Sequence, residues 1–281
     1  IPVELQATIA EHSDELPGVS VKALPVREYP KGTLLGQVLG YVREISETEL
    51  EQFNKKAEEL GDDYRYEPGE LVGKMGIVTS YDVWLRGTNG LDLIGLDSKA
   101  RLVHKETIKE ARAGYTIKLT IDSELQKVVE EELDRVIGEI EKKHPDAKAG
   151  AAVVIEVNTG RILAMASRPF MDPNELTGII SQEIADKYFT SEDAASFNRA
   201  LTGLYPPGST FKMVTAIAAL EAGVIRPTDR FNGSMSSLGS GGIAEWGGQY
   251  FGMVDLYRGL ARSSNIYFQI IGRKVFEKDP E

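Results

Sequence analysis

Apolar and polar residues alternate with two different periods along this chain, and the changes of period predict its elements. From about Ser123 apolar residues recur every three or four positions, the spacing of one helix face, at Leu125, Val128, Val129, Leu133, Val136, Ile137 and Ile140. The charged residues of the same stretch, Glu130 among them, lie largely off this stripe. Pro145 follows, and we expect the helix to end before it.

A β-hairpin is predicted after this helix. An apolar run from Ala149 to Val157 and a second one from Arg161 to Ser167 flank the turn residues Asn158–Gly160. A charged helix is also predicted nearer the start of the chain, because Ser46 and Glu49 have the spacing of a capping box.

The segment Tyr205–Lys212 introduces a third helix. Its two prolines stiffen the chain, Gly208 permits a tight turn, and a helical apolar pattern then runs to Leu220 and ends at Gly223. This helix is apolar on most sides, so we expect it to be buried. Ser209 therefore lies near the helix N-terminus, one turn before Lys212, and the ammonium group is expected to reach the serine hydroxyl.

Ser209 and Lys212 are candidates for nucleophilic catalysis. A serine hydroxyl is a poor nucleophile until a base takes its proton, and a lysine can serve as that base if burial lowers its pKa. A helix N-terminus also favours negative charge that develops beside Ser209. Ser-x-x-Lys is a short pattern that arises by chance, and the alternative is that Ser209 merely caps a helix.

Composition narrows the classes of function. The net charge of −11 over 281 residues argues against a nucleic-acid partner. The chain has no cysteine, and its three histidines show no metal-ligand spacing, so no metal or other cofactor is expected. These histidines all precede Ser209 and the Gly-x-Ser-x-Gly pattern is absent, which excludes the usual hydrolase triads. No run of about 18 apolar residues could span a membrane.

A longer set of motifs resembles a known family. Asn198–Ala200 followed by Leu204–Lys212 resembles the active-site segment of class B penicillin-binding proteins. Residues 73–90 resemble a signature of the family's pedestal, the domain that precedes the transpeptidase domain. The transpeptidase domain itself is resembled by three stretches, residues 120–126, 150–165 and 170–174. The resemblance implies an α+β fold: a partial pedestal or dimerisation domain at residues 1–112, then the N-terminal part of a transpeptidase domain at 113–281, whose antiparallel sheet has helices on both faces.

The resemblance also assigns a second catalytic motif. Ser263 and Asn265 stand where the family has its Ser-x-Asn triplet, which in the family lies between two helices; the apolar pattern alone indicates one helix from about Asp255 to Val275. Ser196 and Asn198 have the same spacing but are interpreted as a helix cap or turn. Ser263 would relay a proton between Lys212 and the leaving amine, and the Asn265 amide would bind Lys212 and the substrate. The Gly/Ser-rich loop from residue 232 to 248 is expected to border the cleft, with substrate-binding residues Trp246, Gly248 and Ser264.

One family motif has no counterpart. The Lys-Thr-Gly or Lys-Ser-Gly triplet of the family does not occur, and Lys148–Gly150 is a near match that precedes Ser209 instead of following it. The chain is therefore interpreted as a fragment that ends before this motif, and the fragment alone is expected to fold its transpeptidase domain incompletely and to be inactive unless another chain supplies the rest.

The function implied by the resemblance is that of a peptidoglycan D,D-transpeptidase of the elongation type. Its substrates would be the stem peptides of peptidoglycan, and β-lactam antibiotics would acylate the same serine. The pedestal would contact a glycan polymerase and elongation scaffold proteins, and the protein would act outside the cytoplasmic membrane, held by a single N-terminal anchor absent from this chain. The alternatives are a serine D,D-carboxypeptidase or β-lactamase, and a pedestal or sensor without catalysis.

Overall fold

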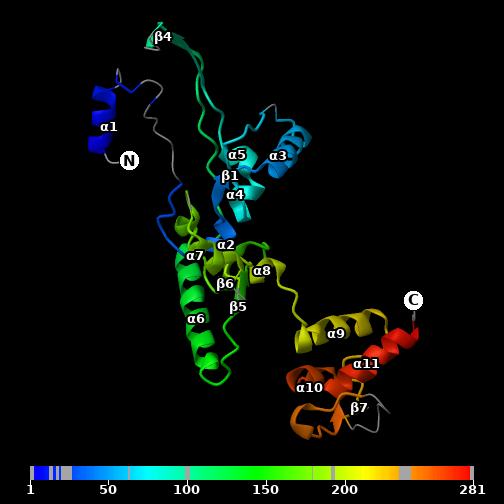
Figure 1. Cartoon of the computed structure of the whole chain (residues 1–281). Coiled ribbons are helices and arrows are strands. Elements are labelled where there is room, and N and C mark those ends of the chain that lie inside the picture. The colour runs from blue at the N-terminus through cyan, green and yellow to red at the C-terminus, as the bar shows by residue number, and fades with distance from the viewer. Residues whose placement is uncertain are drawn as a thin grey trace. The chain divides into compact units, whose positions relative to one another are not determined.

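The computed structural model forms two compact units, residues 1–203 and residues 204–281, whose elements are labelled in Figure 1. It describes residues 3–12, 15–16, 19, 27–62, 64–98, 102–178, 180–190, 194–233 and 242–278. Helices and antiparallel two-stranded sheets alternate within these described ranges. None of the helices in them combines the length and the apolar character needed to cross a lipid bilayer.

The first unit begins with short helices around one small sheet. Strand β1 (Val42–Glu44) pairs antiparallel with β2 (Leu71–Gly73). The capping box predicts α3 correctly: the backbone N–H of Ser46 donates to the Glu49 carboxylate at 2.8 Å. The helices of this part are α1 (Val3–Glu11), α2 (Gly36–Leu39), α3 (Glu47–Glu59), α4 (Gly76–Ser80) and α5 (Asp82–Leu85). A core of Ile45, Ala57, Tyr66 and Val72 holds the sheet against α3.

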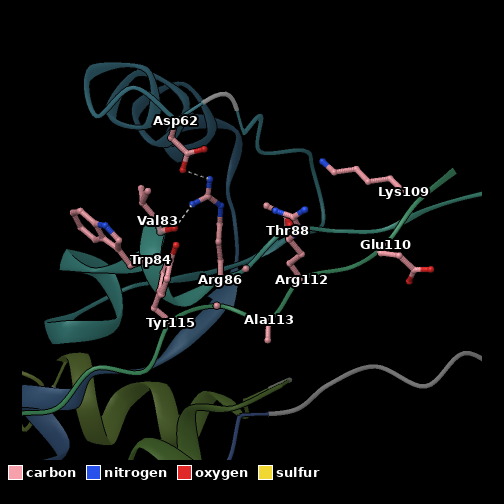
Figure 2. A pocket seen from close by; sticks show the side chains of 12 residues that line it. Asp62, Val83, Trp84, Arg86, Thr88, Lys109, Glu110, Arg112, Ala113 and Tyr115 are labelled. Carbon is pink, nitrogen blue, oxygen red and sulfur yellow. Dashed lines mark hydrogen bonds and ion pairs between the residues drawn. The ribbon is translucent and has the colours of Figure 1, made fainter. Parts of the chain in front are cut away.

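A pocket of about 460 Å³ opens beside this core (Figure 2). Arg86 forms its inner wall: its guanidinium stacks over the ring of Tyr64, 3.9 Å from the centroid, and donates to Asp62 at 2.8 Å and to the carbonyl of Val83 at 2.9 Å. These contacts pair both terminal nitrogens of a largely buried guanidinium, whereas its Nε has no hydrogen-bond partner among the described residues. The observed role of Arg86 is to fasten α5 to the loop that follows α3.

Strands β3 (Leu91–Leu96) and β4 (Leu102–Lys109) form a second antiparallel pair. Helix α6 (Ser123–Glu141) follows, and the Asp122 side chain caps it by accepting from two backbone N–H groups. It packs against β6 (Ile162–Arg168), which pairs antiparallel with β5 (Gly150–Ile155). The predicted helix and hairpin are both confirmed, but Glu130, which lies off the apolar stripe of α6, is buried.

Helix α2 joins the early part of the first unit to the segment that follows β6. The Gln37 amide donates to the carbonyl of Pro169 at 2.6 Å and to that of Ala195 at 2.9 Å. The elements after β6 are η1 (Pro173–Leu176), α7 (Gln182–Ala185), η2 (Asp186–Thr190) and α8 (Arg199–Thr202). The domain boundary predicted near residue 113 falls inside this compact unit.

The second unit is a small helical assembly. Its elements are η3 (Gly208–Phe211), α9 (Lys212–Glu221), β7 (Phe231–Asn232), η5 (Trp246–Gly248), β8 (Met253–Val254), α10 (Leu256–Ala261) and α11 (Asn265–Lys278). Its core consists of Ala216, Ala219, Ile225, Val254, Leu256, Tyr267, Phe268 and Ile271. As the sequence predicts, Gly223 terminates α9: it follows the last helical residues with a φ of +65°.

Two predictions about the helices of this unit are wrong. The helical pattern from Asp255 to Val275 is two helices, α10 and α11, because the chain turns at Ser263, which has a φ of +52°. Helix α9 is not buried all round within its unit: Ala216 and Ala219 pack on α10 and α11, whereas Met213, Val214 and Ile217 remain exposed.

Candidate active site

Ser209 lies in the single 3₁₀ turn η3 that leads into α9. Gly208 starts this turn with a φ of +55°, which glycine adopts without strain. The Thr210 hydroxyl donates to the carbonyl of Pro207 at 2.6 Å and closes the turn from its other side. The turn leaves Ser209 exposed at the entrance of the helix.

Lys212 lies one turn further, and its ammonium group contacts the loop between α10 and α11. The Nζ atom donates to the carbonyl of Ser263 at 2.6 Å, to the Ser263 hydroxyl at 3.0 Å and to the Asn265 side-chain oxygen at 2.7 Å. An ammonium group has three donors, so all three are used. None of these bonds goes to Ser209. The structure thus brings together Lys212, Ser263 and Asn265, with Ser209 on the turn before.

The surroundings of Lys212 favour loss of its proton. The four groups beside Nζ are a carbonyl, a hydroxyl, an amide and the ring of Phe268, 5.8 Å away, and none of them is charged. Burial lowers the pKa of Lys212 below its ordinary value, and the negative charge of Glu245 opposes this only in part. A lysine in this state can accept a proton from a hydroxyl more readily than an exposed lysine can.

Ser263 owes its position to the way α10 ends. Its N–H donates to the carbonyl of Leu260 at 3.1 Å, and the N–H of Ser264 donates to that of Gly259 at 2.9 Å. This pair of bonds is the Schellman motif, whose left-handed residue is usually glycine. Here a serine occupies that left-handed position, and both its carbonyl and its hydroxyl point to Lys212. Backbone strain of this kind is concentrated at functional sites.

Asn265 is held from two sides. Its side-chain oxygen accepts from Lys212, and its side-chain N–H donates to the carbonyl of Ala244 at 2.8 Å. Next to Ala244, the buried Glu245 accepts from the backbone N–H of Asn265 at 2.7 Å and from that of Ile266 at 3.2 Å. The carboxylate therefore caps the start of α11.

The three predicted substrate-binding residues have different surroundings. Ser264 is 0% exposed, its hydroxyl donates to Glu245, and it accepts from the N–H of Tyr267 at 3.1 Å. This hydroxyl is buried and bonded within the protein, and the substrate-binding role of Ser264 stays a prediction. Trp246, 86% exposed, and Gly248 lie on η5, directly after Glu245, and their substrate-binding role stays a prediction.

Sequence reasoning missed Glu245 and Gln269. Glu245 is the only charged residue between residues 231 and 254, and an isolated acid in such a stretch is the signal that marks it. Gln269 lies one turn after Asn265 on α11 and pairs with the backbone N–H and carbonyl of Ile243, both at 2.8 Å. No group of three or more potential metal ligands occurs among the residues that the structure describes.

Comparison with known proteins identifies the family. Residues 1–119 match the penicillin-binding protein dimerisation domain, and residues 150–279 match the penicillin-binding protein transpeptidase domain. The peptidoglycan D,D-transpeptidase MrdA of Escherichia coli is 31% identical over 265 residues, which are 93% of this chain and 39% of that protein. The chain thus spans less than half the length of this curated relative.

Comparison with solved structures points to the same family. A crystal structure of Pseudomonas aeruginosa PBP2 in complex with WCK 5153 has a TM-score of 0.70 and 30% identity, over 92% of this chain and 50% of that one. Helicobacter pylori PBP2 in complex with MreC has a TM-score of 0.73 and 25% identity, over 99% of this chain and 49% of that one. The chain therefore belongs to the class B penicillin-binding proteins. Within that family it is of the elongation type, the type of its MrdA and PBP2 relatives.

Proposed function

We propose that the protein from which this chain comes is a peptidoglycan D,D-transpeptidase that works through a serine acyl-enzyme. The observation that supports this most strongly is the environment of Lys212: a lysine whose pKa is lowered by burial, held by Ser263 and Asn265, one turn after an exposed serine. The match to the transpeptidase domain, and the name of the E. coli relative, support the same reaction.

In the first step, neutral Lys212 takes the proton of the Ser209 hydroxyl as its oxygen attacks the carbonyl between two D-alanines of a stem peptide. The bond to the terminal D-alanine breaks, and its amine leaves with a proton. Ser263 can relay that proton, because its hydroxyl lies 3.0 Å from Lys212 Nζ. The stem peptide remains as an ester on Ser209.

In the second step, an amine from a neighbouring stem peptide attacks the ester. The amine loses a proton, Ser209 regains one, and a new peptide bond cross-links the two stems. A β-lactam reacts with Ser209 in the first step only, because its ring opens onto the serine and blocks the second amine. The chemistry needs no metal ion, since lysine supplies the base and a covalent intermediate replaces an activated water.

The remaining predictions concern the whole protein. We place the domain boundary near residue 113, so that residues 1–112 belong to a pedestal. The H. pylori PBP2 was solved in complex with MreC, and the pedestal here is proposed to contact an elongation scaffold of that kind and a glycan polymerase. The full-length protein is proposed to be anchored in the cytoplasmic membrane with its catalytic domain outside.

Intact-mass measurement of the full-length protein after incubation with benzylpenicillin tests this function. We expect the mass to rise by one penicilloyl group and Ser209→Ala to show no increase. Absence of the adduct on the folded wild-type protein would contradict the proposal. A released, hydrolysed penicillin would instead indicate a β-lactamase, and release of D-alanine from stem peptides without cross-linked product would indicate a carboxypeptidase.

A further inference from the structure

Glu245 is a buried carboxylate that the mechanism above does not use. It is 4% exposed and lies in a stretch without any other charged residue. A buried carboxylate is costly unless hydrogen bonds satisfy it. Glu245 has three such bonds, to the hydroxyl of Ser264 and to the backbone N–H groups of Asn265 and Ile266. All three donors belong to the start of α11.

The short segment from Ile243 to Glu245 is fastened to α11 by side chains of that helix as well. Gln269 pairs with both backbone groups of Ile243, and the Asn265 amide donates to the carbonyl of Ala244. Consequently Asn265 is fixed twice by this segment, through its backbone N–H and through its side-chain N–H. An amide fixed by its nitrogen must present its oxygen in one direction, and that oxygen accepts from Lys212 at 2.7 Å.

From this geometry we propose that Glu245 is a positioning residue, which sets the orientation of Asn265 toward Lys212. The inference rests on the proposed function, because positioning is relevant only if Lys212 acts as the base. Glu245 does not touch the reacting atoms; it acts on them through the N-terminus of α11.

Electrostatics gives Glu245 a second effect that a purely structural cap would lack. The described groups that contact Lys212 Nζ are uncharged, so Glu245 supplies the charge that acts on it and raises its pKa against the effect of burial. Removal of this charge therefore lowers the pKa of Lys212 further. The neutral, basic form of Lys212 would then persist to lower pH.

The test compares three variants of the full-length protein. Glu245→Gln keeps a hydrogen-bond acceptor but loses the charge, and Glu245→Ala loses both. Glu221→Gln is the matched control, since it removes one negative charge from the exposed last residue of α9. The first readout is an NMR titration of Lys212 with isotope-labelled lysine, which requires no activity. The second is the first-order rate constant of acylation by benzylpenicillin as a function of pH, measured below the unfolding temperature.

In Glu245→Gln we expect Lys212 to titrate at lower pH than in the wild type, with the acid limb of the acylation profile displaced in the same direction. In Glu245→Ala the misplaced Asn265 should lower the acylation rate constant about 100-fold. In Glu221→Gln neither readout should change. A Lys212 titration that is unchanged in Glu245→Gln overturns the inference, as does an acylation rate unchanged in Glu245→Ala. If the wild type is never acylated and Lys212 nevertheless responds to Glu245, the proposed function fails, and with it the positioning role, while the electrostatic link between Glu245 and Lys212 is retained.

Discussion

Arg168 is a buried cation and Lys212 a partly buried one, and their surroundings shift the two pKa values in opposite directions. Arg168, at the end of β6, is paired with the carboxylates of Glu130, at 3.1 Å, and Asp134. Burial acts to lower the pKa of Arg168, but these bonds and charges outweigh it and raise the pKa overall. Lys212 contacts only uncharged groups, and burial lowers its pKa.

The charge of the neighbouring acceptors separates a cation with a structural role, Arg168, from one that can act as a base after it loses its proton, Lys212. Two carboxylates hold Arg168 permanently charged, so it can serve only to join α6 to β6. A carbonyl, a hydroxyl and an amide satisfy the donors of Lys212 without adding countercharge, so its proton remains removable. The identity of the acceptors, and not burial itself, decides which role a buried cation has.

The largest effect is expected when Lys212 is made a permanent cation like Arg168. Lys212→Arg should reduce acylation by benzylpenicillin roughly 10³-fold, because a guanidinium cannot act as a base at neutral pH. The measurement is the rate of penicilloyl-protein formation in the full-length protein. Lys278→Arg is the control, since Lys278 in the same unit donates to the carbonyl of Ala222, away from the site. Acylation within tenfold of the wild type would contradict the role given to Lys212.

The converse change removes the structural cation. Arg168→Met should lower the free energy of unfolding by about 3 kcal/mol, because it leaves the buried Glu130 without its cationic partner. Urea denaturation measures the loss, and the acylation rate of the folded protein should not change.

Arg135 provides the control for this experiment. It also bonds two carboxylates, Glu132 and Glu139, but on the exposed face of α6. Arg135→Met should therefore have little effect on stability. If the Arg168 and Arg135 variants lost the same free energy of unfolding, burial would not explain the stabilising effect of Arg168.

A smaller effect concerns the backbone that supports Lys212. Ser263→Gly should stabilise the fold by about 1 kcal/mol, because glycine has no penalty in the left-handed region. It should also slow acylation, because Lys212 loses the hydroxyl beside it. Gly223→Ser makes the reverse change at the matching end of α9, where φ is +65° and no atom crowds the added side chain. Gly223→Ser should destabilise the fold by a similar amount, and thermal unfolding of both variants measures the two effects. If Ser263→Gly were less stable than the wild type, the left-handed backbone at Ser263 would not be strained.

The local elements could be predicted from the sequence because their causes are local. The stripe from Leu125 to Ile140, the Asn158–Gly160 turn and the capping box at Ser46 each depend on neighbours a few residues away. Glu130 could not be placed, since its partner Arg168 lies on another element. Periodicity also could not show the break at Ser263, because the residues on both sides continue the helical spacing.

For the candidate site, the sequence predicted which residues to consider, and the structure shows contacts among them that the sequence did not predict. Motif spacing selected Ser209, Lys212, Ser263 and Asn265, and the last three do lie together. The expected contact between Lys212 and Ser209 rested on helix geometry alone, which does not weigh the competing acceptors of another loop. The sequence predicted neither the position of Glu245 nor the burial of the Ser264 hydroxyl, for one reason: their bond to each other joins two segments that sequence patterns treat separately.

The left-handed Ser263 has a consequence for protein engineering. Stabilising substitutions are easy to find and often reduce function. A library of this protein selected only for thermal resistance would be enriched in glycine at position 263, because that change removes strain from the Schellman turn. The survivors would be robust proteins with an impaired site, so selection of this family for robustness must include a penicillin-labelling step in every round.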